Sequence, residues 1–181
     1  MQTVKTLENR YEKEREMHRI PVALSNGKAI KLLPGRQHEL VKKVIADFCS
    51  LYTPGGRVLY VSDAKEKWSY LDSDALTELG LTIEEHGKMP NVVVHHREKN
   101  RLFLIEAVGS HGPVSPERRQ ELKELFVGTK AGIVYVTAFL DRRTMMKYFE
   151  DISWETEVWI AESPTHLIHF NGKRFLGPYE D

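Results

Sequence analysis

An amide and a carboxylate, Asn91 and Glu106, lie at the two ends of a segment whose pattern predicts a β-hairpin. The polar loop at 97–100 has its centre between positions 98 and 99, so residue numbers that pair across the hairpin sum to 197. Asn91 then faces Glu106, with Cβ atoms about 4.5–5.5 Å apart on one face of the sheet. Two acidic side chains at that separation can share one divalent cation, so the spacing predicts a metal site with an amide in one ligand position.

The neighbours of Glu106 predict an apolar environment, because apolar runs occupy 92–94 and 102–105. An isolated buried carboxylate costs several kcal/mol, so a partner is expected. A second interpretation stays open: Glu106 lies at the end of its strand, is solvated and is paired with an arginine. Pro90 favours a strand that begins at Asn91, since proline tends to start strands at a sheet edge.

The elements that must position this hairpin alternate between helix and strand. Apolar residues at 3.6-residue spacing indicate helices, and short apolar runs bounded by turn residues indicate buried strands. Helices are expected over 35–53, 74–79, 116–126 and 143–150, and strands over 57–61, 132–139, 154–161 and 166–170. With one hairpin inserted, this alternation predicts an α/β domain with a mixed central sheet flanked by helices.

Composition limits the class of protein. The 181 residues, 41% of them hydrophobic, suit a single domain, and a formal net charge of zero indicates neither an acidic nor a basic partner. Cys49 is the single cysteine, which excludes a disulfide framework and fits a reducing compartment, so a cytoplasmic location is expected. No stretch approaches the roughly 18 apolar residues of a membrane span, so no membrane partner is expected.

Residues 1–20 predict a charged helix with a thin apolar stripe. Pro21 and the turn-forming sequence at 25–27 are expected to separate this helix from the rest of the chain. The expected division is therefore an N-terminal helix over 1–20 and a domain over 21–181.

Several segments resemble the C-terminal catalytic domain of the BsuBI/PstI type II restriction endonucleases. They are KMPN (88–91), IEAV (105–108), SHGP (110–113), PVSPERR (113–119), VTAFLDR (136–142), WETEVWIAESPTHLIHFNG (154–172) and RFLGPY (174–179), with looser matches at LPGRQHEL (33–40) and VLYVSDA (58–64). The resemblance covers nearly all of 30–181 and implies the PD-(D/E)xK nuclease fold. Family members carry an additional N-terminal helical region, which makes residues 1–20 a candidate remnant of it.

The resemblance also implies a chemistry. In nucleases of this fold an Asp and a Glu on adjacent strands hold Mg²⁺, which activates the water that attacks the scissile phosphate. The resemblance places the Asp at Asn91 and the Glu at Glu106, and it implies a homodimer that cleaves double-stranded DNA at a palindrome related to CTGCAG. The amide is expected to lower metal affinity and nearly stop hydrolysis, while DNA binding survives. Asn91 is either an engineered change or the mark of a natural homologue that has lost activity.

Further site residues are carried over from the same resemblance. These nucleases have a lysine two residues after the Glu, where this sequence has Val108, and Lys88 and Lys67 are the candidates for the missing cation. Asp63, which follows the strand at 57–61, is a candidate catalytic residue and metal ligand, and Glu39 on the first long helix is another candidate carboxylate.

Four residues are candidates for DNA contacts. Ser110 and His111 follow the strand that carries Glu106 and are expected to contact a phosphate or a base edge. Arg118 and Arg119 lie near the start of a helix, where an arginine can read guanine, hold a phosphate or belong to a solvated helix face.

Other functions fit less well. Val108 stands where a serine-hydrolase elbow around Ser110 requires glycine. The pairs His95-His96 and His166/His169 have odd separations, which place their side chains on opposite faces of a strand and argue against zinc. A DNA-binding or regulatory module on a nuclease scaffold remains an alternative, and Asn91 is the feature that favours it.

Overall fold

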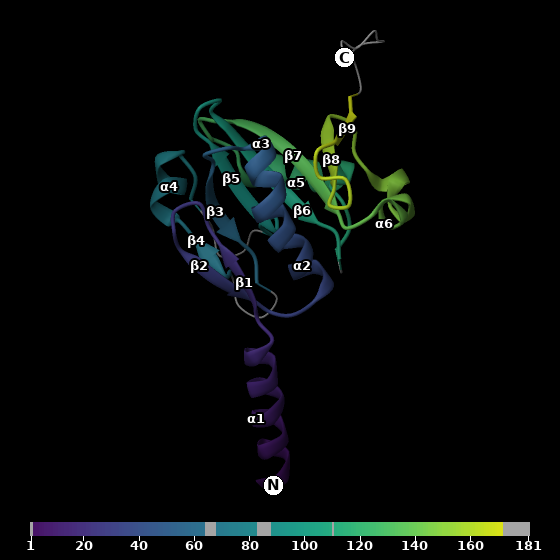
Figure 1. The fold of residues 1–181 in the computed structure, drawn as a ribbon. Helices are drawn as coiled ribbons and strands as arrows, with labels where there is room; N and C mark the ends of the chain where they lie inside the picture. The colour runs from purple at the N-terminus through teal and green to yellow at the C-terminus, as the bar shows by residue number, and fades with distance from the viewer. Residues whose placement is uncertain (1, 64–67, 83–87, 110, 172–181) are drawn as a thin grey trace.

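The protein is built around a seven-stranded mixed sheet. The computed structural model describes residues 2–63, 68–82, 88–109 and 111–171 (Figure 1). The strands lie in the order β4-β3-β5-β6-β7-β8-β9. Their bounds are β3 Arg57–Val61, β4 Tyr70–Leu71, β5 Val92–His96, β6 Arg101–Ala107, β7 Gly132–Phe139, β8 Thr156–Ile160 and β9 Leu167–Phe170. This arrangement confirms the predicted α/β fold with a mixed sheet.

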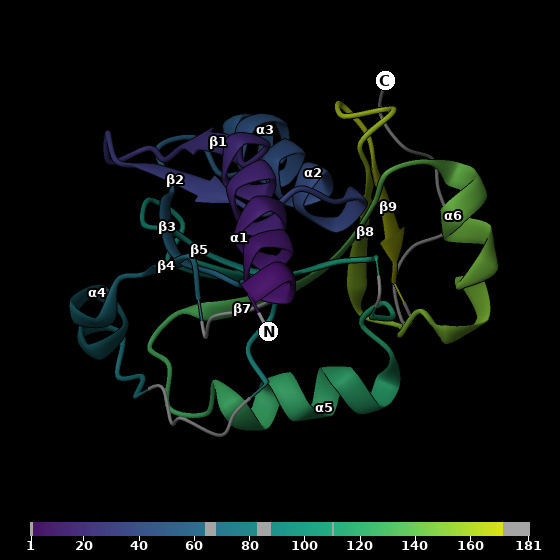
Figure 2. The same cartoon turned by 90° about the horizontal axis from the view of Figure 1, so that it is seen from below.

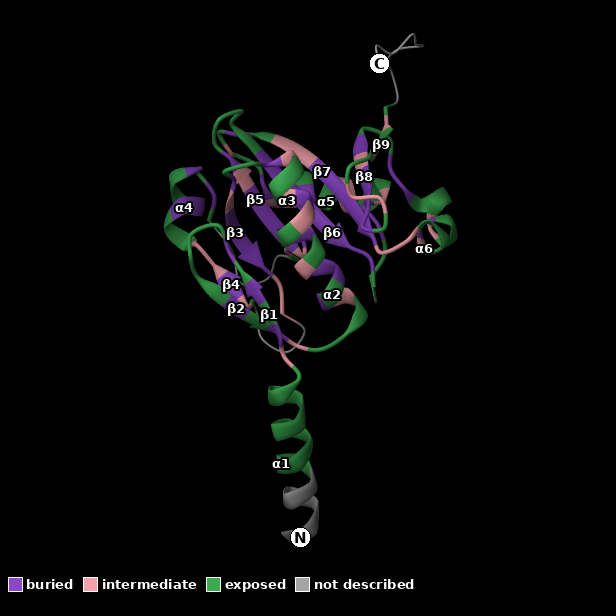
Figure 3. Ribbon diagram, in the orientation of Figure 1, coloured by how far each residue is buried: buried purple, intermediate pink, exposed green. Residues whose placement is uncertain are grey.

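Helices cover both faces of the sheet, as Figure 2 shows with α2 and α3 on one side and α5 on the other. The helices are α2 Arg36–Lys43, α3 Cys49–Tyr52, α4 Ser73–Glu78, α5 Pro116–Leu125 and α6 Arg142–Lys147. Each face of the sheet has its own apolar core. One core contains residues of α2 packed on β5 and β6, and the other contains residues of α4 and α5 packed on the opposite face of the same strands. The sheet is therefore buried on both faces, which explains why its central strands are continuous apolar runs (Figure 3).

The hairpin has the predicted register. Val92 pairs with Ile105 and His96 pairs with Arg101, so paired numbers sum to 197. The loop closes through a hydrogen bond from the Asn100 N–H to the Arg97 carbonyl oxygen (3.0 Å). Asn100 has a φ of 46°, a conformation that asparagine tolerates better than most residues. The loop sequence thus fixes the register of the two strands.

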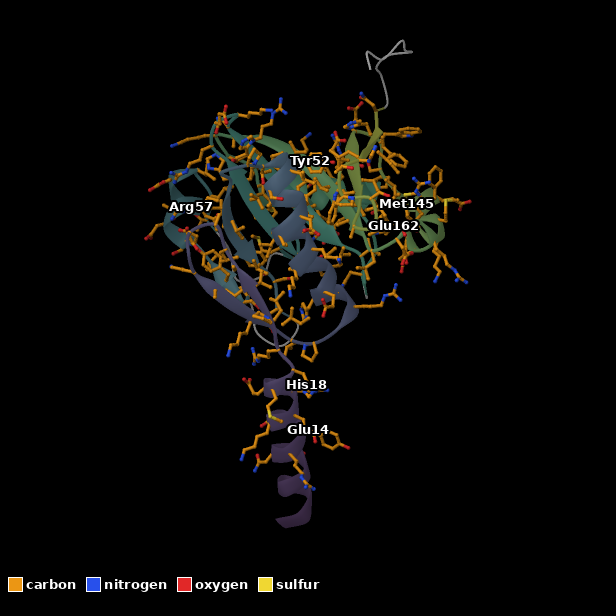
Figure 4. The ribbon with its side chains drawn as sticks, in the orientation of Figure 1. Glu14, His18, Tyr52, Arg57, Met145 and Glu162 are labelled. Carbon is orange, nitrogen blue, oxygen red and sulfur yellow. The ribbon has the colours of Figure 1, made fainter. Side chains whose placement is uncertain are left out.

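The long helix expected over 35–53 is continuous but irregular. Between α2 and α3 the segment Val44–Phe48 is π-helical, which shifts the helix face by part of a turn. Phe48 then packs edge-on against Phe103 of β6 and Trp159 of β8, with ring centroids 6.1 and 5.7 Å apart. At the last residue of α3, the Tyr52 hydroxyl donates to the Pro164 carbonyl oxygen (3.1 Å; Figure 4). The helix is therefore fixed to the middle and to one edge of the sheet.

The interpretation of Pro21 as a separator was wrong. Pro21 lies within β1 (Ile20–Ala23), which pairs with β2 (Ala29–Leu32) in a separate two-stranded sheet. The turn sequence at 25–27 joins these two strands, and the proline is tolerated because its side is exposed while Ile20 and Val22 are buried. Sequence reasoning also missed β4, a strand of only two residues.

An N-terminal helix, α1 (Gln2–Met17), was expected and is present. It projects away from the rest of the molecule in Figure 1, and its described side chains from Glu8 onward are exposed (Figure 3). The His18 ring nitrogen contacts the Glu14 carbonyl oxygen (2.7 Å), which closes the end of the helix (Figure 4). The division into 1–20 and 21–181 stays a prediction.

No described helix has the length and apolar composition that crossing a membrane requires.

The last strands are shorter than expected. Glu155 has a φ of 59°, which interrupts an extended strand, so β8 begins at Thr156. Trp159 is fully buried, as expected for a core residue, whereas Trp154 is 66% exposed and contacts Phe170 with a centroid distance of 5.9 Å. The helix expected over 143–150 is α6 followed by a 3-10 turn at Phe149–Asp151.

Thr137 on β7 ties the segment before α5 to the sheet, because its buried hydroxyl accepts from the Val114 N–H (3.0 Å). Thr137→Val is expected to lower the free energy of unfolding by about 1–3 kcal/mol, because it leaves that buried N–H without an acceptor. Urea titration measures the change. Thr165→Val removes an exposed hydroxyl and is expected to change stability by less than about 0.5 kcal/mol. Equal effects of the two substitutions would contradict this role.

Candidate active site

The hairpin places Asn91 beside Glu106. Asn91 directly precedes β5, and the register that pairs Val92 with Ile105 sets it opposite Glu106. Two hydrogen bonds join the strand ends: the Asn91 backbone N–H donates to the Glu106 carboxylate, and the Ala107 N–H donates to Asn91 Oδ1 (2.8 Å). The predicted juxtaposition of amide and carboxylate is therefore present.

The orientation of the Asn91 amide follows from its neighbours. A backbone N–H can only donate, so the atom that faces Ala107 N is the oxygen. Asn91 Nδ2 donates to Ser62 Oγ (3.1 Å), and the Ser62 N–H donates to the Asn91 carbonyl oxygen (2.8 Å). The amide therefore links β6 to the end of β3 and completes the hydrogen bonding where the strands separate.

A cavity of about 900 Å³ opens at these strand ends. Its wall carries both signs of charge. Among the described residues, the acidic side chains on it are Asp63, Glu106, Glu117, Glu121 and Asp151, and the basic ones are His38, Lys88, His111 and Arg118. Asn91, Glu106 and Asp63 thus share one cavity, as the sequence predicted, and their roles as metal ligands stay a prediction.

Glu106 is buried, with 6% of its surface exposed, and is paired with an arginine. Arg118 Nε lies 2.7 Å from Glu106 Oε1. Each of the two interpretations of Glu106 is therefore confirmed in one respect. The side chain is buried, as the first expected, and its partner is an arginine, as the second expected. Burial raises the pKa of Glu106, while the charge and hydrogen bond of Arg118, the charge of His111 and the hydrogen bond from Asn91 N–H lower it; burial has the larger effect.

Asp63 lies on the β3 side of the cavity. Its Oδ2 accepts from the Ser69 hydroxyl (2.8 Å). Burial first, and then the charges of Asp63 and Glu106, raise the pKa of Tyr60, so both carboxylates act on this hydroxyl in the cavity wall. Asp63 is therefore close enough to Glu106 for the two to influence one side chain.

The remaining predicted residues are placed unequally. Lys88 and His111 are exposed and line the cavity, whereas Ser110 and Lys67 lie outside the described residues. Arg119 is not part of the lining: its guanidinium lies 5.0 Å from the centroid of the Tyr135 ring.

Two further positions lie away from the cavity wall: a candidate carboxylate, and the position where the family has a lysine. Glu39 is exposed on α2 and does not line the cavity. Val108 is buried in an apolar cluster.

Gln37 is a cavity residue that sequence reasoning missed. Its Nε2 donates to the Ala107 carbonyl oxygen (3.1 Å), so the end of β6 is held from α2 as well as from β5. A Cβ at Gly109 would lie 2.7 Å from Gln37 Cβ, which explains a glycine there. Gln37 lies in the segment LPGRQHEL, whose match to the family was the only sequence signal for it.

The donor set for a divalent cation is incomplete. Among the described residues, no group of three or more His, Cys, Asp or Glu is arranged to hold a metal ion. The Glu106 carboxylate already bonds Arg118, and the residue opposite it is a neutral amide. At position 91 the amide offers a neutral oxygen where a carboxylate would offer an anionic one, and Mg²⁺ prefers anionic oxygen ligands.

Arg118→Met is expected to lower the free energy of unfolding by about 3–5 kcal/mol at pH 7, because it leaves a buried carboxylate without its counter-charge. The pKa of Glu106 then rises further above its ordinary value of 4.5. The part of the loss that comes from the charge of Glu106 is therefore absent at pH below 4.5 and grows as the pH rises above it, while the part that comes from the hydrogen bonds to the Lys88 and Met89 carbonyl oxygens does not depend on pH. Denaturant titration across this pH range checks the result.

Two variants serve as controls for this prediction. Glu106→Gln combined with Arg118→Met is expected to be more stable than Arg118→Met alone at pH 7, since no buried charge remains. Arg119→Met on the same helix removes an arginine that stacks on a tyrosine ring, so its effect is expected to be independent of pH over the same range. A pH-independent loss in Arg118→Met would contradict the ion-pair account.

The chain matches known proteins over nearly its full length. Residues 20–173 match the family model of the BsuBI/PstI restriction endonuclease domain. The chain is 55% identical over 175 residues to the type II restriction enzyme BsuBI of Bacillus subtilis, covering 97% of this chain and 55% of that protein. It is 30% identical over 178 residues to the type II restriction enzyme AplI of Arthrospira platensis, covering 94% and 55%.

A solved structure agrees with these relatives. The SdaI restriction endonuclease superposes with a TM-score of 0.86 at 43% identity, over 97% of this chain and 55% of that one. The chain thus spans about half the length of the proteins it matches. With a family model matched over most of its residues and a shared fold, this chain belongs to the BsuBI/PstI restriction endonuclease domain family.

Proposed function

We propose that this chain is the DNA-cleaving region of a type II restriction endonuclease and that Asn91 impairs its hydrolysis of double-stranded DNA. The observation that carries the proposal is the pairing of Asn91 with the buried Glu106 at the wall of a charged cavity. Family membership supports the reaction class, because the similar proteins are named type II restriction enzymes. The expected cofactor is Mg²⁺, held by Glu106, residue 91 and Asp63.

An aspartate fits position 91 without rearrangement. Its Oδ1 can accept from the Ala107 N–H as the amide oxygen does, and its Oδ2 can accept from the Ser62 hydroxyl, which is able to donate as well as to accept. The change adds one negative charge beside Glu106 and leaves the strand pairing intact. With that ligand the cation would polarise the phosphate and activate water.

The cavity offers positive side chains for a phosphate backbone. Lys88 and His111 are exposed on its wall, so they are the described residues best placed to meet DNA. Arg118 is engaged by Glu106 and Arg119 by Tyr135, which makes base reading by either arginine less favourable than the helix position suggested. Ser110 remains a candidate that lies outside the described residues.

The remaining parts of the proposal rest on the family. A palindromic target related to CTGCAG is matched by a protein with two-fold symmetry, so a homodimer with two active sites is the expected assembly. Its expected location is the cytoplasm. A catalytically inactive DNA-binding or regulatory module is the second candidate function, and the amide at position 91 is the observation that favours it.

Asn91→Asp is expected to raise the rate of Mg²⁺-dependent DNA cleavage by at least about 100-fold, because a carboxylate in place of the neutral amide contributes several kcal/mol to holding the cation. Cleavage of a duplex that carries the palindrome, with and without Mg²⁺, measures the rate. The unchanged chain is expected to cleave weakly or not at all.

Matched variants define what the result means. Asn100→Asp makes the same chemical change at the loop end of the same hairpin and is expected to leave activity unchanged. Asn91→Asp combined with Glu106→Gln is expected to lose the gained activity. Full activity of the unchanged chain would show that residue 91 is not a ligand, and an inactive Asn91→Asp protein that still binds DNA would favour the regulatory module.

Lys88→Ala is expected to weaken DNA binding equally for all sequences and to reduce the slope of log affinity against log salt by about 0.9, as for the loss of one phosphate contact. Fluorescence anisotropy at several salt concentrations measures both quantities. Lys123→Ala removes an exposed lysine of α5 that does not line the cavity and is expected to leave the slope unchanged. A loss confined to the palindromic duplex would assign Lys88 to base reading instead.

A further inference from the structure

The strand position two residues after Glu106 supplies no cation. Val108 is 4% exposed and packs with Phe139 and Met145 in an apolar cluster beside α6. Its N–H donates to the Ala138 carbonyl oxygen (3.0 Å), which fixes the backbone there. A lysine at this position would place its ammonium group among apolar side chains, at a large desolvation cost. The positive charge of this site must therefore come from another element.

Arg118 reaches the same carboxylate from α5. Its Nε contacts Glu106 Oε1 (2.7 Å), and its Nη1 contacts Glu121 Oε2 (3.0 Å). Its Nη2 donates to the carbonyl oxygens of Lys88 (2.9 Å) and Met89 (3.3 Å), in the segment that leads into Asn91. Among the described residues these contacts use four of the five guanidinium N–H groups, and the remaining one is on Nη1.

Hydrogen bonds at the start of α5 fix the position of Arg118. Ser115 caps the helix, and its hydroxyl accepts from the Arg118 N–H (3.1 Å). The preceding Val114 is held on both sides, by its N–H to Thr137 Oγ1 (3.0 Å) and by its carbonyl oxygen to the Ser153 N–H (2.9 Å). The guanidinium is thus fixed relative to β6 and β7 before any ligand binds.

The cavity needs such a charge. Among the described residues its wall carries five acidic side chains, whose field repels a phosphate, against one lysine, one arginine and two histidines. Lys88 is exposed, whereas the Arg118 side chain is 18% exposed and is held by its contacts. A fixed and partly desolvated charge stabilises a developing negative charge more than a mobile, solvated one does.

We propose that Arg118 supplies, from α5, the positive charge that faces the scissile phosphate, in place of a lysine on the strand of Glu106. The inference rests on the proposed nuclease function and adds to it the source of the cation. The same charge lies beside the ligand Glu106, so it also opposes binding of a divalent cation there. The Arg118 charge is thus expected to favour cleavage and to weaken cation binding. A purely structural role would change both in the same direction.

The test uses the Asn91→Asp protein as parent. Arg118→Met is expected to lower kcat for DNA cleavage by about 100-fold, as for the loss of one stabilising donor, with less than about threefold change in KM. It is also expected to raise the affinity for Ca²⁺, measured by calorimetry without DNA, by about tenfold. Arg118→Lys keeps the charge without the planar fork and is expected to retain kcat within about tenfold of the parent.

Controls make each outcome decisive. Far-UV circular dichroism at the assay temperature selects conditions in which each variant is folded, and Lys123→Met, on the same helix and away from the cavity wall, is expected to change neither kcat nor Ca²⁺ affinity. If Arg118→Met leaves kcat unchanged, or lowers kcat and Ca²⁺ affinity together, the role of Arg118 is overturned and the nuclease function stands. If the Asn91→Asp parent neither cleaves DNA nor binds Ca²⁺, the proposed function fails and this inference fails with it.

Discussion

The buried carboxylate of Glu106 is the constraint on which the rest of this site depends. At 6% exposure it cannot remain ionised without partners, and the fold provides two donors from different elements: the guanidinium of Arg118 and the backbone N–H of Asn91. Because burial still raises its pKa, the site holds this charge at a cost in stability. A cation bound to this carboxylate, as the proposed function requires, would offset part of that cost.

The surrounding fold explains how those donors are held. β5 and β6 form a tight antiparallel hairpin, while β6 and β7 are parallel and need a crossover, which α5 provides. The crossover places Arg118 at the end of β6, the strand that carries Glu106. Gln37 holds the Ala107 carbonyl oxygen from the α2 side, so the last residues of β6 are tied from both faces of the sheet.

Local patterns in the sequence were sufficient to predict the hairpin and the residues that face each other across it. A polar loop with a fixed centre sets the register, and register sets which residues face each other, so the pairing of Asn91 with Glu106 could be predicted. The strand β7 could be predicted with its correct bounds because it is a continuous apolar run between turn residues. The family resemblance added the nuclease fold, which periodicity alone does not distinguish from other mixed sheets.

The features that were missed depend on distant parts of the chain. Pro21 was expected to separate the first helix from the rest of the chain, yet it lies within β1, whose pairing with β2 leaves the proline exposed. The contact of Arg118 with Glu106 crosses from helix to strand, and no local pattern separates such an arginine from one on a solvated face. The π-helical turn at Val44–Phe48 follows from the packing of Phe48 against two strands.

Asn91 and aspartate have nearly the same shape, so the pairing of strands survives either residue and only the charge available to a cation differs. The most direct test of this account is the anomalous scattering of Mn²⁺ in crystals soaked with equal concentrations of the metal. The account predicts a Mn²⁺ peak between the side chains of residue 91 and Glu106 in the Asn91→Asp protein, and none there in the unchanged chain. A peak at the same place and height in both proteins, or none near Glu106 in either, would contradict it.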